Sequence, residues 1–290
     1  MDEAASAAVE GPQVTSRSRL ALLGAGVMGE TVLSGLVRAG WDPADLVATD
    51  RRPERVAELE AAYGITMTTN VEAVAGASTV VLVVKPQDMR GLLAEIAPTL
   101  DPEALVVSLA AGVDTTTLEA GLPQGQPVVR VMANTPAQVD EGMAAIAAGS
   151  SATDDHLVRV RDILSATGRV EVVPEAYLDA VTAISGSGPA YLFFVVEAMI
   201  EAGVHLGLPR DLSTELVVQT MLGSAKLLRE SGEHPTVLRE RVTSPGGTTA
   251  AALRELEDHK VRAAFLSAME AARDRSQTLA AAARGQRAGA

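Results

Sequence analysis

The stretch LALLGAGVMGETVLSGLVRAG, residues 20–40, decides the fold of the first half of this 290-residue chain. In it an apolar run leads directly into Gly24, Gly26 and Gly29, spaced G-x-G-x-x-G, and then into a helical pattern. Gly24 permits a tight turn, Gly26 lets the backbone approach a pyrophosphate, and Gly29 lets the helix pack on the strand. The helix N-terminus then offers free N–H groups to the anion. We therefore predict a dinucleotide-binding strand–turn–helix, with a plain glycine-rich turn as the alternative.

Short apolar runs alternate with amphipathic segments from residue 19 onward. The runs are continuously apolar, as in parallel strands covered on both faces, and they lie at 20–24, 45–49, 65–67, 79–84, 104–110 and 128–132. Helical patterns separate several of them, at 29–39, 53–63 and 87–96. This alternation predicts an α/β fold with a doubly wound parallel sheet of the Rossmann type. Two more strands, at 144–147 and 170–173, flank a helix near 153–165 and are expected to complete the sheet.

The chain changes character after Pro174. The C-terminal part has almost no strand signal and four helical patterns, at 176–184, 189–206, 210–231 and 248–278. Gly and Pro residues punctuate them at 185–189, 207–209, 231–235 and 244–247. We predict a flexible tail over 1–17, a dinucleotide-binding domain over 18–175 and an all-helical domain over 176–290. The apolar faces of these helices are broader than one small bundle can bury, which favours self-association through this domain.

The composition excludes several classes of function. The net charge of −13 argues against nucleic acid and anionic membranes as partners. Cysteine is absent, which removes disulfides, thiol nucleophiles and thiolate metal sites, and the four histidines have no ligand spacing, so we expect no metal site. The longest apolar run, 190–200, contains Glu197 and is shorter than the roughly 18 residues of a membrane span. The N-terminus lacks the pattern of a signal peptide, and a soluble cytoplasmic protein is expected.

The segment ATDRRPER, residues 48–55, bears on the choice of dinucleotide. Asp50 alone would accept hydrogen bonds from a ribose 2′-hydroxyl, which favours NAD. Arg51 and Arg52 offer two cations to a 2′-phosphate, which favours NADP. The alternative is that both arginines are a solvated pair at the start of a helix. On these residues we predict NADPH as the cofactor, with NADH as the alternative.

Three other strand ends carry candidate ligand contacts. Lys85, in VVKPQ, follows the fourth run at the edge of the sheet where ligands bind, as a base or as a positioning group. Ala110 and Ala111 end the fifth run with small side chains that leave room for a flat ring. Asn134, in MANTP, lies where a nicotinamide carboxamide or a substrate is expected, although a plain turn is an alternative.

The segment SGSGPAY, residues 185–191, interrupts an otherwise helical pattern. It predicts either a kink that exposes the backbone N–H groups of Ser187 and Gly188, or a helix that stops and restarts. Exposed N–H groups at such a kink are candidate contacts for an anionic substrate. The histidines at 205, 234 and 259 are expected on the surface or in loops, and none is predicted to be the catalytic acid.

The segment VTSPGGTT, residues 242–249, runs directly into another helical pattern. Ser244 and the glycines and threonines after it form a nest of N–H donors and hydroxyls suited to a carboxylate. A simpler interpretation is that Thr248 or Thr249 caps the helix. Capping and carboxylate binding are compatible with each other here.

Taken together, these motifs resemble those of the pyrroline-5-carboxylate reductase family. The resemblance covers residues 19–278 and rests on GAGVMG, VVKPQ, AAGV, VMANTP, SGSGPAY and LRERVTSPGGTTAAALRELED. It implies the last step of proline biosynthesis, in which NADPH reduces (S)-1-pyrroline-5-carboxylate to L-proline by hydride transfer to an imine carbon. Such an imine has a pKa near neutral, so solvent can supply its proton and the enzyme acts mainly by positioning and electrostatics.

The resemblance also implies roles for particular residues. Its last loop holds the substrate in the family, with Thr249 as the candidate partner of the ring nitrogen, so Thr249 and Ser244 are the predicted catalytic residues. The predicted substrate-binding residues are Glu175, Ser187, Gly188, Gly246, Gly247, Thr248 and Thr249. Besides Asp50, Arg52 and Asn134, the predicted cofactor-binding residues are Leu23, Gly24, Ala25, Gly26, Val27, Met28, Arg51, Asn70, Val83, Val84, Lys85, Pro86, Leu109, Ala110 and Ala111. The family pairs its helical domains into dimers that often assemble into rings.

Two other classes of protein compete with this interpretation. A β-hydroxyacid dehydrogenase shares the G-x-G-x-M-G pattern and a helical second domain. That family needs a catalytic lysine in its inter-domain helix, and this chain has no lysine between Asp179 and Glu201. A nucleotide sensor would bind NADP without turnover, and an assay of NADPH oxidation with the pyrroline substrate separates it from an enzyme.

Overall fold

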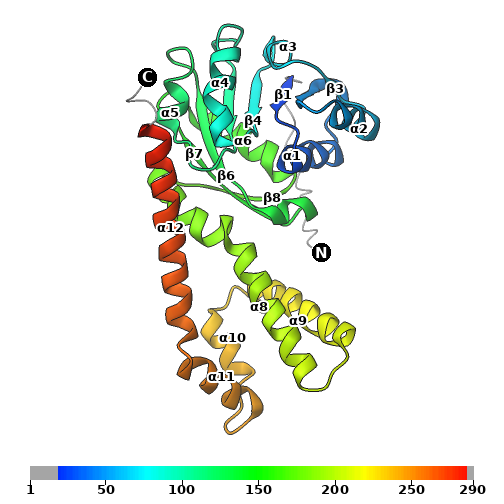
Figure 1. Ribbon diagram of the computed structural model, residues 1–290, viewed down its shortest axis with the longest axis vertical. Coiled ribbons are helices and arrows are strands. Elements are labelled where there is room, and N and C mark those ends of the chain that lie inside the picture. The colour runs from blue at the N-terminus through cyan, green and yellow to red at the C-terminus, as the bar shows by residue number, and fades with distance from the viewer. Residues whose placement is uncertain (1–18, 286–290) are drawn as a thin grey trace, which may run out of the picture. The chain divides into compact units, whose positions relative to one another are not determined.

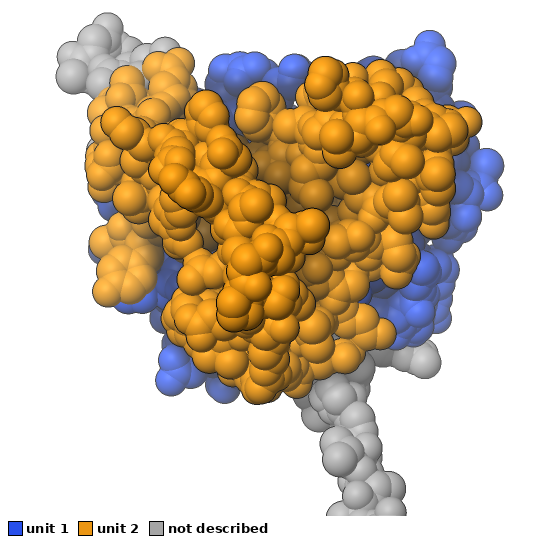
Figure 2. All heavy atoms as spheres, turned by 90° about the horizontal axis from the view of Figure 1, so that it is seen from below, with its two compact units in different colours: residues 1–132, 137–175 blue, residues 133–136, 176–290 orange. Residues whose placement is uncertain are grey.

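The structure, a computed structural model, describes residues 19–285 and their side chains as far as residue 281 (Figure 1). The tail predicted over 1–17 lies outside the described residues. Within them the chain divides into two compact units, which Figure 2 shows in different colours. The first unit extends to Met132 and resumes over Ala137–Glu175, and the second combines Ala133–Pro136 with the residues from Ala176 onward.

The first unit is built on one sheet of eight strands in the order β3-β2-β1-β4-β5-β6-β7-β8. The strands are β1 (Leu20–Leu23), β2 (Leu46–Thr49), β3 (Thr66–Met67), β4 (Thr79–Leu82), β5 (Leu105–Ser108), β6 (Val128–Met132), β7 (Gly142–Ala148) and β8 (Gly168–Val172). The predicted doubly wound fold is confirmed, but the sheet is mixed, since β7 runs antiparallel to β6. The connection between Met132 and Gly142 is too short for a parallel crossover, which takes about a dozen residues.

Helices cover both faces of this sheet. Alternate strand side chains, among them Ala21, Val80 and Val106, join one buried cluster with residues of α3, α4 and α5. On the opposite face α1 and α6 pack together, and α6 contacts β6, β7 and β8. The helices are α1 (Val27–Arg38), α2 (Pro53–Tyr63), α3 (Asn70–Val74), α4 (Pro86–Ile96), α5 (Thr115–Glu119) and α6 (Asp154–Ser165), with 3-10 turns at Pro43–Asp45, Thr135–Val139 and Glu175–Tyr177.

The second unit is helical. Its elements are α7 (Leu178–Val181), the π-helical turn η4 (Thr182–Gly186), α8 (Gly188–His205), α9 (Arg210–Ser231), α10 (Pro235–Arg241), α11 (Thr248–Asp258) and α12 (Val261–Gly285). The prediction of one helix over 248–278 is wrong, because Lys260 adopts a positive φ of 56° and separates α11 from α12. The predicted exposure of the Ser187 N–H is also wrong, because this group donates to the Thr182 carbonyl at 2.8 Å. The chain continues from α7 through the π turn into α8.

Much apolar surface of the second unit is exposed. Within the described structure α8 has no buried residue, and Phe193 and Phe194 are 68% and 73% exposed. By length and composition alone, the helical stretch Glu175–His205 is sufficient to cross a membrane, and it is not a core helix of the described structure, since only 6% of its most apolar part is buried. The prediction that no segment reaches this length is therefore wrong. It counted SGSGP as a break, whereas the π turn keeps the segment helical.

Candidate functional site

The turn after β1 has the backbone geometry that a closely approaching ligand needs. Gly24 has a φ of 99°, and a Cβ at this position would lie 2.7 Å from the Val83 carbonyl oxygen. A Cβ at Gly29 would lie 2.4 Å from the Gly24 carbonyl oxygen, so α1 can approach β1 only through a glycine. Gly26 is the N-cap of α1 and forms no side-chain capping bond. A Cβ there would meet no described heavy atom within 4 Å, which leaves the N–H groups of the first turn open to an anion.

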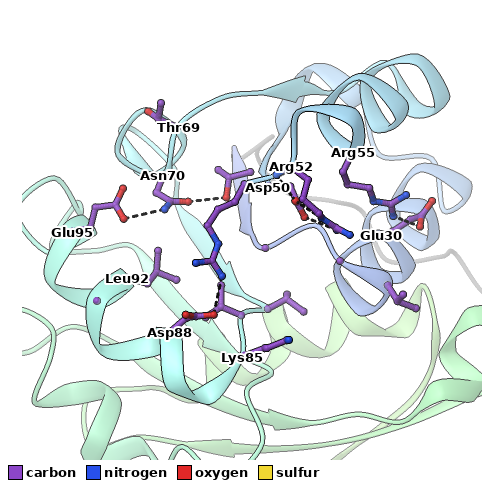
Figure 3. Close-up of a pocket in the computed structure, with 18 of the residues that line it drawn as sticks. Glu30, Asp50, Arg52, Arg55, Thr69, Asn70, Lys85, Asp88, Leu92 and Glu95 are labelled. Atoms are coloured by element: carbon purple, nitrogen blue, oxygen red, sulfur yellow. Dashed lines mark hydrogen bonds and ion pairs between the residues drawn. The ribbon is translucent and has the colours of Figure 1, made fainter.

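A cavity of about 1200 Å³ lies next to this turn in the first unit. The segments after the carboxyl ends of β1, β2 and β4 supply part of its lining, and residues of α1, α2, α3 and α4 supply most of the rest (Figure 3). The predicted cofactor residues that line it are Gly24, Gly26, Val27, Asp50, Arg51, Arg52, Asn70, Val83, Val84 and Lys85. Those outside its lining are Leu23, Ala25, Met28, Pro86, Leu109, Ala110, Ala111 and Asn134, whose contacts with a cofactor stay predictions.

The arginines of the cavity all have carboxylate partners. Arg52 binds Asp50 through two nitrogens, at 2.9 and 3.1 Å, and Arg51 Nη2 lies 2.9 Å from Asp88 Oδ2. The hydrogen bond from the Arg52 guanidinium is the main reason why the pKa of Asp50 is lowered, and it outweighs the effect of burial. Lys85 also lines the cavity and forms no ion pair with any described residue. It can therefore bind an anionic group of a ligand without first breaking an ion pair within the protein.

Arg55 and Glu30 form a second network that the sequence analysis missed. Arg55 Nε donates to the carbonyl of Ala25, inside the glycine turn, at 3.1 Å, and its terminal nitrogens reach Glu30 and Glu58. The Tyr63 hydroxyl donates to Glu30 Oε1 at 2.9 Å. These bonds, chiefly the one from Arg55, lower the pKa of Glu30 against the effect of burial. No local signal reveals the network, because Glu30 and Arg55 lie on different helices, 25 positions apart.

Asn70 connects three elements at the far wall of the cavity. Its Oδ1 accepts a hydrogen bond from the Thr49 hydroxyl at 2.7 Å, and its Nδ2 donates to Glu95 Oε2 at 3.1 Å. Thr49 ends β2 and Glu95 belongs to α4. Asn70 opens α3, whose N-cap Thr69 forms a capping box with Glu72. The helix is too short for an apolar period to show in the sequence. The capping-box pattern of Thr69 and Glu72 was the local signal that could have predicted α3.

The second unit carries the predicted substrate loop. Pro245 and Gly246, with a φ of 70°, form the centre of a turn in which the Gly247 N–H donates to the Ser244 carbonyl at 3.0 Å. Pro before a glycine of positive φ is typical of a type II turn. Gly247 is the N-cap of α11 and forms no side-chain capping bond in the described structure. The alternative that Thr248 or Thr249 caps this helix is therefore wrong.

Two of the other predicted ligand residues are engaged by protein groups. Asn134 Nδ2 donates to the carbonyl of Ser185 in the π turn at 3.1 Å. Glu175 accepts hydrogen bonds from the Thr115 N–H and hydroxyl, at 2.8 and 2.6 Å, and from Arg130 at 3.2 Å. Their roles toward cofactor and substrate stay predictions. The described residues contain no cluster of His, Asp and Glu able to hold a metal ion.

Known proteins resemble the chain over most of its length. One family profile, described as pyrroline-5-carboxylate reductase dimerisation, matches residues 175–279, and another, described as NADP oxidoreductase coenzyme F420-dependent, matches residues 19–112. A pyrroline-5-carboxylate reductase of Corynebacterium melassecola is 46% identical over 264 residues, which cover 90% of this chain and 98% of that protein. A solved reductase of the same name from Coxiella burnetii has a TM-score of 0.87 and 34% identity, covering 91% and 99% of the two chains. The Plasmodium falciparum pyrroline carboxylate reductase with NADP bound has a TM-score of 0.82 and 30% identity, covering 91% and 98%.

Proposed function

The chain belongs to the pyrroline-5-carboxylate reductase family, and from this membership we propose that it reduces (S)-1-pyrroline-5-carboxylate to L-proline with NADPH. The reaction is the last step of proline biosynthesis. The observation that carries the proposal is the turn at 244–247, which leads into α11 within the segment that matches the family's dimerisation profile. A β-hydroxyacid dehydrogenase needs a catalytic lysine in its inter-domain helix. This chain has no lysine between Asp179 and Glu201, which argues against that class of enzyme.

The cavity of the first unit fits a dinucleotide. The open space at Gly26 and the uncapped first turn of α1 suit a pyrophosphate, and the end of β2 carries groups for the adenosine ribose. When bound, NADPH supplies the hydride for the imine carbon. The protein's part is to hold the dinucleotide on the glycine turn and to orient it along the carboxyl ends of β1 and β4. We propose residues 18–175 as the domain that does this.

We assign the substrate to the helical domain, residues 176–290, around the turn at 244–247. Ser244 and the N–H group of Gly246 bind the carboxylate, Gly247 shapes the turn through its bond to the Ser244 carbonyl, and the Thr249 hydroxyl accepts a hydrogen bond from the protonated ring nitrogen. Since Thr249 lies in the first turn of α11 and does not cap it, its hydroxyl is available for this role. Ser187, Gly188 and Thr248 complete the proposed site in this domain, and for Glu175, which belongs to the first unit, a contact with substrate stays a prediction. The ring nitrogen carries a proton taken from solvent, so no strong acid is required of the chain.

The helical domain also mediates self-association, as the family's dimerisation profile over 175–279 indicates. The exposed apolar side chains of α8, Phe193 and Phe194 among them, are the surface that a second copy would bury. We propose that this contact forms a homodimer, which can assemble further into larger rings. We also propose that the second copy, and not a membrane, covers the stretch Glu175–His205. The net charge of −13 disfavours nucleic acid and anionic membranes as partners, and we propose a soluble cytoplasmic enzyme.

The test monitors the absorbance of NADPH with pyrroline-5-carboxylate as the second substrate. We expect oxidation of NADPH and formation of L-proline. We expect no reduction of NADP when 2-hydroxy or 3-hydroxy acids are offered in the reverse direction. Binding of NADPH without turnover would identify a sensor, and equal activity on 3-hydroxyisobutyrate would identify a β-hydroxyacid dehydrogenase.

A further inference from the structure

Asp88 faces Arg51 across the dinucleotide cavity. Arg51 comes just after the end of β2, whereas Asp88 lies in the first turn of α4, the helix after β4. Arg51 Nη2 and Asp88 Oδ2 are 2.9 Å apart, and both residues line the cavity. Figure 3 labels Asp88. The ion pair therefore joins two walls of the cavity that lie 37 positions apart in the sequence.

This pair differs from the other arginine pair at the end of β2. The Asp50 side chain is only 9% exposed and accepts hydrogen bonds from Nε, Nη2 and the backbone N–H of Arg52. Arg51 has one hydrogen bond to Asp88, and the two side chains are 84% and 34% exposed. An exposed ion pair with a single hydrogen bond adds little stability. Arg51 is thus the arginine that can most readily exchange its carboxylate for another anion.

We propose that Asp88 sets the balance between NADPH and NADH by competing with the cofactor's 2′-phosphate for Arg51. The inference rests on the proposed function, because it concerns the same dinucleotide site. A phosphate dianion forms stronger charge-assisted hydrogen bonds with a guanidinium than one exposed carboxylate does. When Arg51 turns to the phosphate, Asp88 loses its partner and keeps its negative charge beside the dianion. NADH carries an uncharged 2′-hydroxyl and leaves the pair intact, so Asp88 weakens the binding of NADPH alone.

A purely structural role for Asp88 makes a different prediction. A carboxylate in the first turn of α4 also complements the positive end of the helix dipole. If that were its whole role, Asp88→Asn would lower the melting temperature and would change the binding of NADPH and NADH by the same factor. The ratio of the two dissociation constants therefore separates specificity from stability.

The experiment measures the dissociation constants of NADPH and NADH by calorimetry on the full chain, without substrate. For Asp88→Asn we expect NADPH to bind about three to ten times more tightly, the range for removal of one competing charge in a half-exposed site. We expect the NADH constant to change by less than about twofold, since NADH has no 2′-phosphate that could draw Arg51 away from Asp88. Asp88→Glu keeps the charge and should keep the wild-type ratio. The matched control is Asp140→Asn, which breaks an exposed pair with Arg38 outside the cavity and should leave both constants unchanged.

A second background tests the competition itself. In Arg51→Ala there is no guanidinium to compete for, so Asp88→Asn should improve NADPH binding by less than half of its effect in the wild type. A full effect in this background, or an unchanged NADPH/NADH ratio in the single Asp88→Asn variant, would overturn the proposal. Wild-type turnover of pyrroline-5-carboxylate is measured separately. If the ratio fails to shift while turnover is present, the inference fails and the proposed function stands.

Discussion

Replacing Arg55 by methionine should disturb the glycine turn without removing any residue of that turn. Arg55 Nε donates to the Ala25 carbonyl, and the same guanidinium binds Glu30 and Glu58. Methionine keeps most of the aliphatic length of the side chain but offers none of these donors. Glu30 is then left with the Tyr63 hydroxyl as its hydrogen-bond donor from α2.

The structure allows the cost to be worked out. A hydrogen bond to a charged group contributes about 1.5–3 kcal/mol. The Arg55 side chain is only 13% exposed, but Glu30 is 32% exposed and solvent screens part of the interaction. We therefore expect the free energy of unfolding to fall by about 2 kcal/mol in total. For a folding unit of about 150 residues this lowers the melting temperature by about 4–8 °C.

The kinetic effect distinguishes positioning from direct contact. The Ala25 carbonyl lies beside Gly26, whose turn is proposed to hold the pyrophosphate that NADPH and NADH share. Arg55→Met should therefore raise the KM for both dinucleotides by a similar factor, about threefold to tenfold. The control is Arg38→Met, which breaks an exposed pair with Asp140 and should change neither KM. If Arg55→Met raised the KM for NADPH alone, Arg55 would be a contact of the 2′-phosphate. If it changed neither KM, the inference that Arg55 holds the glycine turn in its binding geometry would be refuted.

Three further predictions concern the same two sites. Replacing both Arg51 and Arg52 by alanine should raise the KM for NADPH and leave the KM for NADH nearly unchanged, because each lost charged hydrogen bond weakens NADPH binding by up to about 1.5–3 kcal/mol. An unaltered ratio of the two KM values would mean that Asp50, and not the arginines, determines the cofactor preference. Thr249→Val should lower turnover at least tenfold, which corresponds to about 1.5 kcal/mol in the activation free energy. The melting temperature should stay unchanged, because Thr249 does not cap α11. Near-normal turnover would show that Thr249 does not contact the substrate. The pKa of Glu30 is lowered from 4.5 in the folded state, so its stabilisation is present above pH 4.5 and is lost as the pH falls through the folded value. Urea denaturation at a series of acidic pH values should show this loss in the wild type and not in Glu30→Gln.

The strands and the cofactor cavity could be predicted because their signals are local. Each strand is a short apolar run, and candidate ligand residues such as Gly24, Asp50 and Lys85 come soon after the end of such a run. In a doubly wound sheet the carboxyl ends of parallel strands share one edge, so Gly24, Asp50 and Lys85 come together although they are far apart in the sequence. The topology thus turned separate local signals into one site.

Other features could not be predicted because they depend on partners distant in the sequence or on unusual backbone geometry. The helices α3 and α5 are too short for an apolar period to appear. Lys260 takes a positive φ without glycine or proline to indicate a break between α11 and α12. Conversely, the glycines at 186 and 188 suggested a break where the chain forms a π turn and continues. Glycine and proline therefore indicated turns correctly at 207–209, 231–235 and 244–247, but not at 185–189.

Glu175 shows how far a residue's role depends on its packing. The resemblance to the family predicts that Glu175 binds substrate. In the structure, however, its carboxylate accepts two hydrogen bonds from Thr115 and one from Arg130. Arg130 is 6% exposed, and its Nη2 is buried without a hydrogen-bond partner among the described residues. Removing Glu175 leaves the buried charge of Arg130 uncompensated, which costs up to about 3–5 kcal/mol, whereas Glu175 itself is 29% exposed and partly solvated. Any loss of activity in Glu175→Ala would therefore include a loss of folded protein. Glu175→Gln keeps one oxygen acceptor for Thr115 but also removes the charge opposite Arg130, so the turnover of either variant is measured per folded molecule, together with its melting temperature.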